Sequence, residues 1–147
     1  MKKIHLKGSW LIRAPREEVY KIMSDFENMP KYFPKVAQSL RIIKREGNNL
    51  TIEAKAKTFG RVISVHMETQ LRPPIGYISD NKNDIGTSGH EEFLMEEVPE
   101  GTKINYTYDV ELNNPLFRIL GRFLIGWHAM RYWKHAVIDQ LRKMLEK

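Results

Sequence analysis

The stretch Gly101–Leu120, GTKINYTYDVELNNPLFRIL, changes from the repeat of a strand to the repeat of a helix. Up to Leu112 its apolar side chains alternate with polar ones, which is typical of a strand with one buried face. Asn113-Asn114-Pro115 then combines a helix cap with a proline at the first helical position. The apolar residues of the strand are Ile104, Tyr106, Tyr108, Val110 and Leu112. We therefore predict an aromatic-rich strand followed directly by a helix.

No proline interrupts the helical pattern from Leu116 to Lys147, so we predict one helix of about 30 residues. At 100° per residue, one apolar stripe collects Leu116, Leu120, Phe123, Trp127, Met130, Val137, Ile138, Leu141 and Leu145. Lys134 falls near the middle of this stripe and Arg131 at its edge. Either Lys134 extends past the sheet to water, or one of these cations faces the interior. An interior cation would pair with Glu91 or with an acid group of a ligand.

Towards the N-terminus, a two-residue repeat continues back to Pro34, and turn-forming residues divide it into six strands. The turns are predicted at Gly47-Asn48-Asn49, Phe59-Gly60, Pro73-Pro74, Asn81 to Gly86 and Pro99-Glu100-Gly101. Another strand is predicted over Lys3–Ile12. Between it and Pro34 we expect two short helices, one from Pro15 to about Asp25 and one that contains Phe26, Met29 and Phe33. This order predicts an α+β domain over residues 1–147.

Such a sheet, curved around one amphipathic helix, leaves an apolar space that suits a small ligand. We predict that this space is lined by Met67, Phe93, Met95, Ile104, Tyr106, Tyr108, Phe123, Trp127 and Arg131. The alternative is that these side chains simply fill a core. The strand His90–Glu97 can be interpreted in two ways. We choose the one in which Glu91, Phe93 and Met95 face inward, and in the alternative His90, Glu92 and Leu94 replace them.

Composition excludes several functions. The chain has no cysteine, which excludes disulfides, thiolate nucleophiles and zinc–thiolate sites. The net charge of +6 is spread along the chain without a long basic run, which disfavours nucleic acid as a partner. No apolar run has the length of a membrane span, and the start MKKIHLKGSWLIRAP lacks the apolar region of a signal peptide. We therefore expect a cytoplasmic location.

Residue patterns of common catalytic sites are missing too. The sequence has no His-x-x-x-His pair for a metal, no Gly-x-Ser-x-Gly, no phosphate loop and no dinucleotide fingerprint. We therefore predict neither a metal nor a cofactor. Asp25 and Glu27 could act as acid and base, but Asp25 stands where one helix ends and another begins. We interpret Asp25 as a helix cap that accepts backbone N–H groups.

The segment 12–36, IRAPREEVYKIMSDFENMPKYFPKV, resembles the polyketide cyclase/dehydrase and lipid transport family of the START-like (SRPBCC, Bet v 1-like) superfamily. Gly101-Thr102 at the start of the last strand and the terminal amphipathic helix fit the same pattern. The resemblance implies the helix-grip fold. In that fold a seven-stranded curved antiparallel sheet wraps around a long C-terminal helix, with two short helices after the first strand.

The resemblance also implies a function in which a small hydrophobic ligand is the partner. The leading hypothesis is binding or transport of a lipid-, quinone- or polyketide-like molecule without catalysis. The alternative is a polyketide aromatase/cyclase or dehydratase, with Tyr106, Tyr108, Arg131 or His90 moving protons. A weaker alternative is binding to ribosome or membrane surfaces through basic charge. The oligomeric state is left open.

Overall fold

Strands and helices follow one another in the order that the sequence predicts. The computed structural model describes residues 3–58, 61–84, 86–112 and 130–146. Its strands are β1 (Lys3–Ile12), β2 (Ser39–Glu46), β3 (Asn49–Thr58), β4 (Arg61–Arg72), β5 (Gly76–Asn83), β6 (Thr87–Val98) and β7 (Gly101–Leu112). Its helical segments are α1 (Arg16–Met23), the 3₁₀ turn η1 (Phe26–Asn28), α2 (Met29–Tyr32), α4 (Met130–Trp133), the π-helical η3 (Lys134–Ile138) and α5 (Asp139–Leu145). The predicted α+β class is confirmed.

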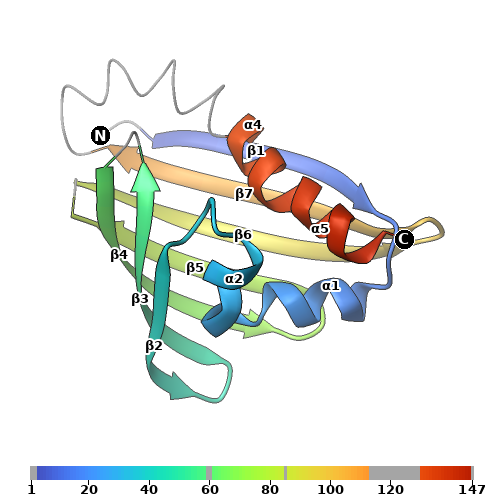
Figure 1. Ribbon diagram of the computed structural model, residues 1–147, viewed down its shortest axis with the longest axis horizontal. Coiled ribbons are helices and arrows are strands. Elements are labelled where there is room, and N and C mark those ends of the chain that lie inside the picture. The colour runs from blue at the N-terminus through green and yellow to red at the C-terminus, as the bar shows by residue number, and fades with distance from the viewer. Residues whose placement is uncertain (1–2, 59–60, 85, 113–129, 147) are drawn as a thin grey trace.

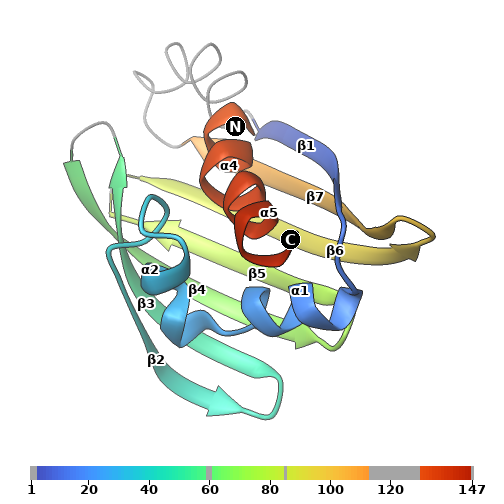
Figure 2. The same ribbon diagram turned by 45° about the vertical axis from the view of Figure 1, so that its right-hand side comes forward.

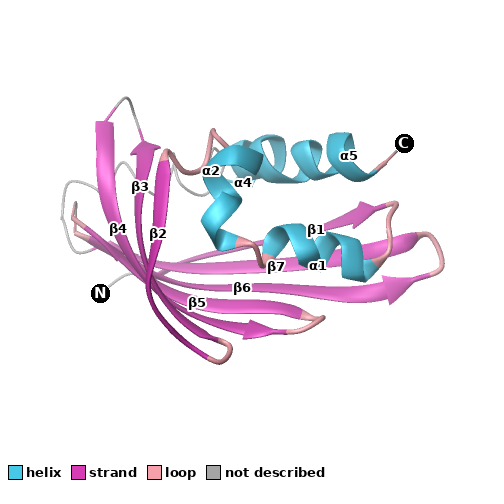
Figure 3. Ribbon diagram, turned by 60° about the horizontal axis from the view of Figure 1, so that its bottom comes forward, coloured by secondary structure: helices cyan, strands magenta, loops and turns pink. Residues whose placement is uncertain are grey.

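The described strands form one seven-stranded antiparallel sheet in the order β1-β7-β6-β5-β4-β3-β2. Strands that follow one another from β2 to β7 are neighbours, whereas β1 pairs with β7. The sheet is curved, and the described helices lie on its concave side (Figures 1 and 3). Every strand therefore has an inner face, turned towards the helices, and an outer face on the opposite side.

Apolar side chains at alternate strand positions fill the inner face, as the period-two pattern predicts. Phe93 and Met95 are buried on β6, so the first of the two interpretations of His90–Glu97 is correct. On β7, Ile104 and Tyr106 are buried as well. Burying an aliphatic or aromatic side chain of this size contributes about 1.5–3 kcal/mol, so this face supplies much of the stability.

The turn between β6 and β7 is fixed against the chain that leads into α1. Gly101 has φ +141°, and a Cβ at this position would lie 2.4 Å from the carbonyl oxygen of Ile12. Only glycine allows so close a backbone approach. Next to it, the buried Thr102 Oγ1 donates a hydrogen bond of 2.7 Å to the carbonyl of Ala14. These contacts hold the start of β7 beside the start of α1.

Helix α1 and the last turns of the C-terminal helix each bury one side against the sheet. Helix α1 buries Val19 and Met23, and the C-terminal helix buries Val137, Ile138 and Leu141. Pro15 lies just before the first turn of α1 rather than inside it, as the residue that caps the helix. Among the described residues, no helix combines the length and the hydrophobicity needed to cross a bilayer.

The C-terminal helix departs from the regular α-helix that we predicted, and its predicted part before Met130 lies outside the described residues. Segment η3 is π-helical, which inserts one extra residue and rotates the helix by about 100° at that point. Trp133 consequently packs against the core, although it is not on the predicted stripe. Figure 2 shows α4 and α5 crossing the sheet above β7 and β6.

The prediction that Lys134 lies near the middle of the apolar stripe is wrong, because Lys134 is the first residue of the π-helical turn. Lys134 Nζ lies 3.1 Å from Asp139 Oδ1, and its side chain is only partly buried. The lysine therefore forms a partly exposed ion pair along its own helix. Of the two roles that the sequence left open for Lys134, this arrangement agrees with extension towards water.

Candidate functional site

Aromatic side chains form a row across the middle of the inner face. Tyr77, Phe93 and Tyr106 occupy paired positions on β5, β6 and β7. The rings of Tyr77 and Phe93 stack with their centroids 5.4 Å apart. From the helix side, Trp133 stacks on Tyr106 at 4.0 Å with an interplanar angle of 17°, while Phe26 meets the Tyr77 ring edge-on. The row thus packs against both the C-terminal helix and η1.

Gly8 continues this row on β1, where it pairs with Tyr106. A Cβ on Gly8 would lie 2.2 Å from Cη2 of Trp10 and 2.9 Å from Cε of Met130. The Trp10 ring in turn lies 5.2 Å from the Trp133 ring. The missing side chain therefore provides the space that Trp10 and Met130 occupy beneath the helix.

Beside the aromatic row lies a group of polar side chains that we call the polar cluster. Its members are Thr69, Ser79, Asn81, Glu91 and Tyr108, together with the hydroxyl groups of Tyr77 and Tyr106. Thr69 Oγ1 and Ser79 Oγ share a buried hydrogen bond of 2.9 Å. Tyr108 Oη donates to Asn81 Oδ1 over 2.9 Å. The polar cluster therefore has its own hydrogen-bond network on an otherwise apolar surface.

Glu91 is the acidic member of the polar cluster. Its Oε2 accepts a hydrogen bond from Tyr106 Oη, and the Tyr77 hydroxyl is a second hydrogen-bond partner. Burial raises the pKa of Glu91, while these two hydrogen bonds and the charge of His90 act in the opposite direction. The hydroxyl groups of Tyr106 and Tyr77 thus form hydrogen bonds to Glu91 that water would otherwise form.

The tyrosines near Glu91 remain protonated at neutral pH. Burial, with a further contribution from the Glu91 charge, raises the pKa of Tyr108 to about 12. The same two causes raise the pKa values of Tyr77 and Tyr106 well above the usual value. These phenols therefore act as hydrogen-bond donors, and Glu91 accepts from Tyr106.

The residues predicted to line a ligand space fall into three groups. Phe93, Met95, Ile104 and Tyr106 are buried in the core of the inner face. Met67 and Tyr108 belong to the same face but keep part of their surface accessible, as do Val65 and Glu91. Arg131 is exposed on the first turn of α4, and Phe123 and Trp127 lie outside the described residues. The structure therefore brings six of the nine predicted residues to one face.

Sequence reasoning missed several neighbours of these residues. Trp133 escaped because the π-helical turn changes the phase of the helix. Asn81 was assigned to a turn, whereas β5 continues to Asn83 and Asn81 lies on the inner face beside Tyr108. The alternation of Tyr77, Ser79 and Asn81 could have indicated this strand, because the three share one parity.

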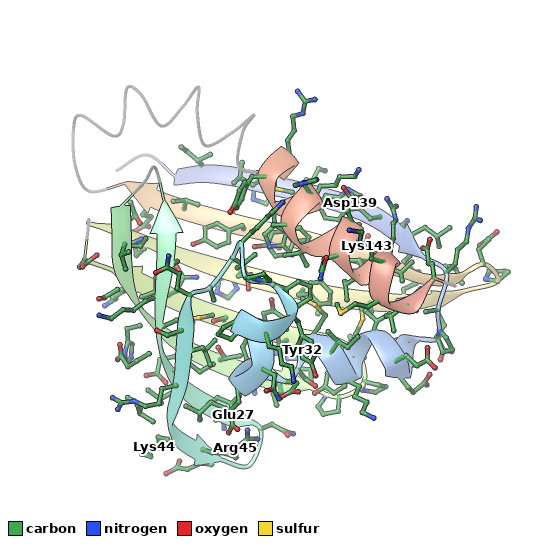
Figure 4. All side chains as sticks on the ribbon, in the orientation of Figure 1. Glu27, Tyr32, Lys44, Arg45, Asp139 and Lys143 are labelled. Atoms are coloured by element: carbon green, nitrogen blue, oxygen red, sulfur yellow. The ribbon has the colours of Figure 1, made fainter. Side chains whose placement is uncertain are left out.

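Asp25 has a different hydrogen-bond role from the one predicted, and its role is still architectural. Its Oδ2 accepts hydrogen bonds of 2.9 Å from Asn28 Nδ2 and from Tyr32 Oη, and its side chain makes no cap bond to a backbone N–H. Glu27 is exposed. Figure 4 places Glu27 and Tyr32 on the short helical segments before β2. Asp25 therefore joins η1 to α2 through side-chain donors.

Histidines lie on the outer face between carboxylates of neighbouring strands. His66 contacts Glu53 and Glu68, and His90 contacts Asp80 and Glu92. His5 pairs with Asp109 at the β1 edge. The part of the chain that the structure describes holds no group of three or more histidine or acidic side chains placed to bind a metal ion.

A shallow surface depression of about 440 Å³ lies at the other end of the sheet, where the β6–β7 turn meets the start of α1. Residues 13–17 and 97–101 line it, and Arg16 Nη2 lies 3.6 Å from Glu97 Oε1 across it. None of the residues predicted to bind a ligand takes part in this depression.

The family of the chain follows from comparison with known sequences. The family model described as polyketide cyclase / dehydrase and lipid transport matches residues 3–146. The chain belongs to this family. No curated protein sequence matches it significantly. Membership of the polyketide cyclase/dehydrase and lipid transport family supports either hydrophobic-ligand binding or a role of the cyclase type.

Solved structures share the helix-grip fold with this family member. The di-domain ARO/CYC protein BexL of the BE-7585A biosynthetic pathway superposes with a TM-score of 0.83 at 15% identity, over 99% of this chain and 50% of its own. The Zhui aromatase/cyclase from Streptomyces sp. R1128 gives 0.75 at 12% identity, over 97% and 93% of the two chains. A START superfamily protein from Mycobacterium smegmatis gives 0.70 at 16% identity, over 98% and 97%. The chain thus spans about half the length of the di-domain protein.

Proposed function

We propose that this protein binds or carries a small hydrophobic molecule between the inner face of the sheet and the C-terminal helix, without catalysis. One observation carries the proposal: the inner face keeps accessible surface beside the buried aromatic row. Met67, Val65 and Tyr108 supply apolar surface there, and Glu91 supplies a polar end. Ligand sites combine such apolar walls with a few polar groups.

The remaining predicted residues extend the proposed site. Phe123 and Trp127, which lie outside the described residues, and Arg131 on α4 were predicted from the sequence, and we propose that they also contact the ligand. Methionine adapts its shape to different ligands, which suits Met67 to a wall that receives a flexible molecule. The fold of the START superfamily protein and the name of the family both support this proposal.

Binding can be tested with the neutral fluorescent probe 1-N-phenylnaphthylamine. Met67→Trp should fill the proposed space and weaken probe binding at least tenfold. Glu68→Trp is the matched control, because the next residue of β4 is exposed on the outer face, and it should bind the probe like the wild type. Native mass spectrometry of the gently purified protein should also detect a bound molecule. Equal binding by the two variants, or no binding by the wild type, would contradict the proposal.

A second candidate function is aromatase/cyclase chemistry, which the contact between Glu91 and Tyr106 favours. In such a reaction Glu91 would remove a proton from a methylene carbon of a bound polyketide. The resulting carbanion would attack a ketone carbon of the same chain, which forms a carbon–carbon bond and an alkoxide that takes up a proton. Loss of the second proton from the same methylene carbon, with departure of the protonated hydroxyl group as water, would then form a carbon–carbon double bond. A carboxyl group whose pKa is raised by burial is suited to this role.

Turnover of a poly-β-ketone substrate separates this candidate from simple binding. Glu91→Gln and Tyr106→Phe should lower the rate of ring formation by about 10²–10⁴ if these groups move protons. Arg131→Ala tests the further residue that the sequence suggested for this chemistry. A rate unchanged in all three variants would exclude these roles.

A further inference from the structure

Tyr108 lies against the inner face of the sheet, because the neighbouring strand has no side chain at that point. Gly89 shares the inward parity of Glu91 on β6 and pairs with Asn81 on β5. A Cβ on Gly89 would lie 2.6 Å from Oη, 2.7 Å from Cζ and 2.8 Å from Cε1 of Tyr108. Three bonded atoms of a planar phenol can be so nearly equidistant only from a point off the plane of the ring. The ring of Tyr108 therefore covers Gly89 with one of its faces.

A hydrogen bond fixes the far end of this ring. Tyr108 Oη donates to Asn81 Oδ1 over 2.9 Å, so the side chain reaches from β7 across β6 to β5. Met67 pairs with Asn81 from the next strand, β4. Both Met67 and Tyr108 keep part of their surface accessible. Met67, Asn81 and the Tyr108 ring thus form one area of the inner face, which we call the floor.

Tyr108 differs from the aromatic rings beside it in what lies on it. Tyr77 and Phe93 stack on each other at 5.4 Å, and Trp133 stacks on Tyr106 at 4.0 Å. Within the part of the chain that the structure describes, the ring contact of Tyr108 is with Tyr106, at the longer centroid distance of 6.5 Å. One face of the Tyr108 ring lies on the sheet, so its accessible surface belongs to the opposite face and the edges.

The free face of an aromatic ring is best covered by another flat ring. Offset stacking of two rings is favourable beyond the area that it buries, and a methionine beside the pair adds contacts between sulfur and ring. On the basis of the proposed binding function, we infer that the ligand carries a flat conjugated ring, which stacks on Tyr108 with Met67 beside it. Gly89 and Asn81 are positioning residues, because they hold the Tyr108 ring against the sheet.

Three probes with ten carbon atoms and one hydroxyl group separate ring shape from hydrophobicity. 2-Naphthol is flat, decahydro-2-naphthol has the same carbon skeleton in puckered form, and 1-decanol is a flexible chain. Equilibrium dialysis at pH 7, where all three are neutral, measures their dissociation constants. We expect 2-naphthol to bind at least about threefold more tightly than either of the others, although it is the least hydrophobic of the three. Equal or weaker binding of 2-naphthol would overturn the preference for a flat ring.

Variants of the floor connect this preference to Tyr108. Tyr108→Leu replaces the ring with an aliphatic side chain and should remove the advantage of 2-naphthol, whereas Tyr108→Phe keeps the ring and should retain most of it. Gly89→Ala forces the ring away from the sheet and should remove the advantage too. Ser88→Ala, at the next position on the outer face, is the matched control and should bind all three probes like the wild type. An advantage that persists in Tyr108→Leu would overturn the assignment to Tyr108.

Stacking on the protein surface is a separate source of ring binding. Tyr132→Leu removes a half-exposed ring outside the floor and should leave the advantage of 2-naphthol unchanged. Loss of the advantage in this variant would overturn the assignment to the floor. The wild-type comparison decides the ring preference even if Gly89→Ala does not fold. A wild type that binds none of the three probes and no 1-N-phenylnaphthylamine would overturn the proposed function itself, whereas equal binding of all three would overturn only the ring preference.

Discussion

Gly8 shows how one residue can determine the packing of the inner face. Its missing side chain leaves room for Trp10 and Met130, which both contact the aromatic core around Tyr106. The nearest atom of the Trp10 ring is only 2.2 Å from the position that a Cβ would take. A rigid ring on one side and a packed helix on the other allow little adjustment. The glycine is therefore required by its surroundings rather than by its backbone angles.

We predict that Gly8→Ala lowers the free energy of unfolding by about 1–3 kcal/mol, the usual cost of forcing an extra group into a packed core. Urea unfolding followed by circular dichroism measures this loss. The control is Ser9→Ala at the next position, where the exposed hydroxyl only donates to Asn105, and it should change the stability by less than about 0.5 kcal/mol. Equal stability of Gly8→Ala and the wild type would contradict the packing described here.

Single residues also mark the limit of prediction for the site. The parity rule placed Glu91 on the inner face, because Phe93 and Met95 on the same strand must be buried. It gave no sign that the phenols of Tyr106 and Tyr77 would meet Glu91, since those contacts depend on the register between strands. Asn81 was missed for another reason: asparagine is common in turns, and here the sheet extends past it.

The C-terminal helix shows the same limit at the scale of an element. Its apolar repeat predicted the burial of Val137, Ile138 and Leu141 correctly. The repeat assumed a constant rotation per residue, however, and the π-helical turn at η3 breaks that assumption. The π-helical turn directly follows Trp133, whose ring stacks on Tyr106. We interpret it as the change in helix geometry that allows both Trp133 and the residues after it to pack on the sheet. The packing partner is not contained in the periodicity of the helix itself.

We predict that the two neighbouring aromatic residues of α4 differ sharply in their importance. Trp133→Ala should reduce the free energy of unfolding by about 3 kcal/mol, because it removes a ring packed on Tyr106. Tyr132→Ala should cost less than about 1 kcal/mol, because half of that side chain is exposed. Thermal or urea unfolding of the two variants provides the comparison. If Tyr132→Ala lowered the free energy of unfolding more than Trp133→Ala, Tyr132 rather than Trp133 would face the sheet, and the rotation of the helix described here would be wrong.

At the scale of the whole molecule, the two faces of the sheet differ in charge. The outer face carries His66 between Glu53 and Glu68, and Lys82 lies opposite it on β5. Hydrogen bonds to Glu53 and then to Glu68 raise the pKa of His66 above its usual value. A histidine with a raised pKa in the folded state stabilises that state fully at pH values below the unfolded pKa, and the stabilisation is lost as the pH rises through the folded pKa.

We therefore predict that His66→Gln destabilises the protein more at pH 5.5 than at pH 8.5. The difference should be below about 1 kcal/mol, because the ion pairs are exposed to solvent. Urea midpoints of wild type and variant at both pH values measure it, and 1 M NaCl should reduce it by screening. A variant that loses more stability at the higher pH would reverse the sign argued here.

The arrangement of the strands was only partly predictable. Local turns such as Gly47-Asn48-Asn49 and Pro73-Pro74 predicted that each strand from β2 to β7 neighbours the next. The pairing of β1 with β7 has no local signal, because it joins segments at opposite ends of the sequence. The resemblance of segment 12–36 to a known family implied a seven-stranded antiparallel sheet but did not predict which strand lies beside β1.

The pairing of β1 with β7 also determines when this protein can finish folding during synthesis. His5 contacts Asp109, which is 104 positions further along the chain. On the ribosome, β2 to β6 can form hairpins one after another as they emerge, whereas β1 has no partner until β7 has left the exit tunnel. Contacts between such distant segments slow folding. Strand β1, which is translated before the six other strands of the sheet, is thus among the last to be placed, and until then its apolar residues are open to chaperones.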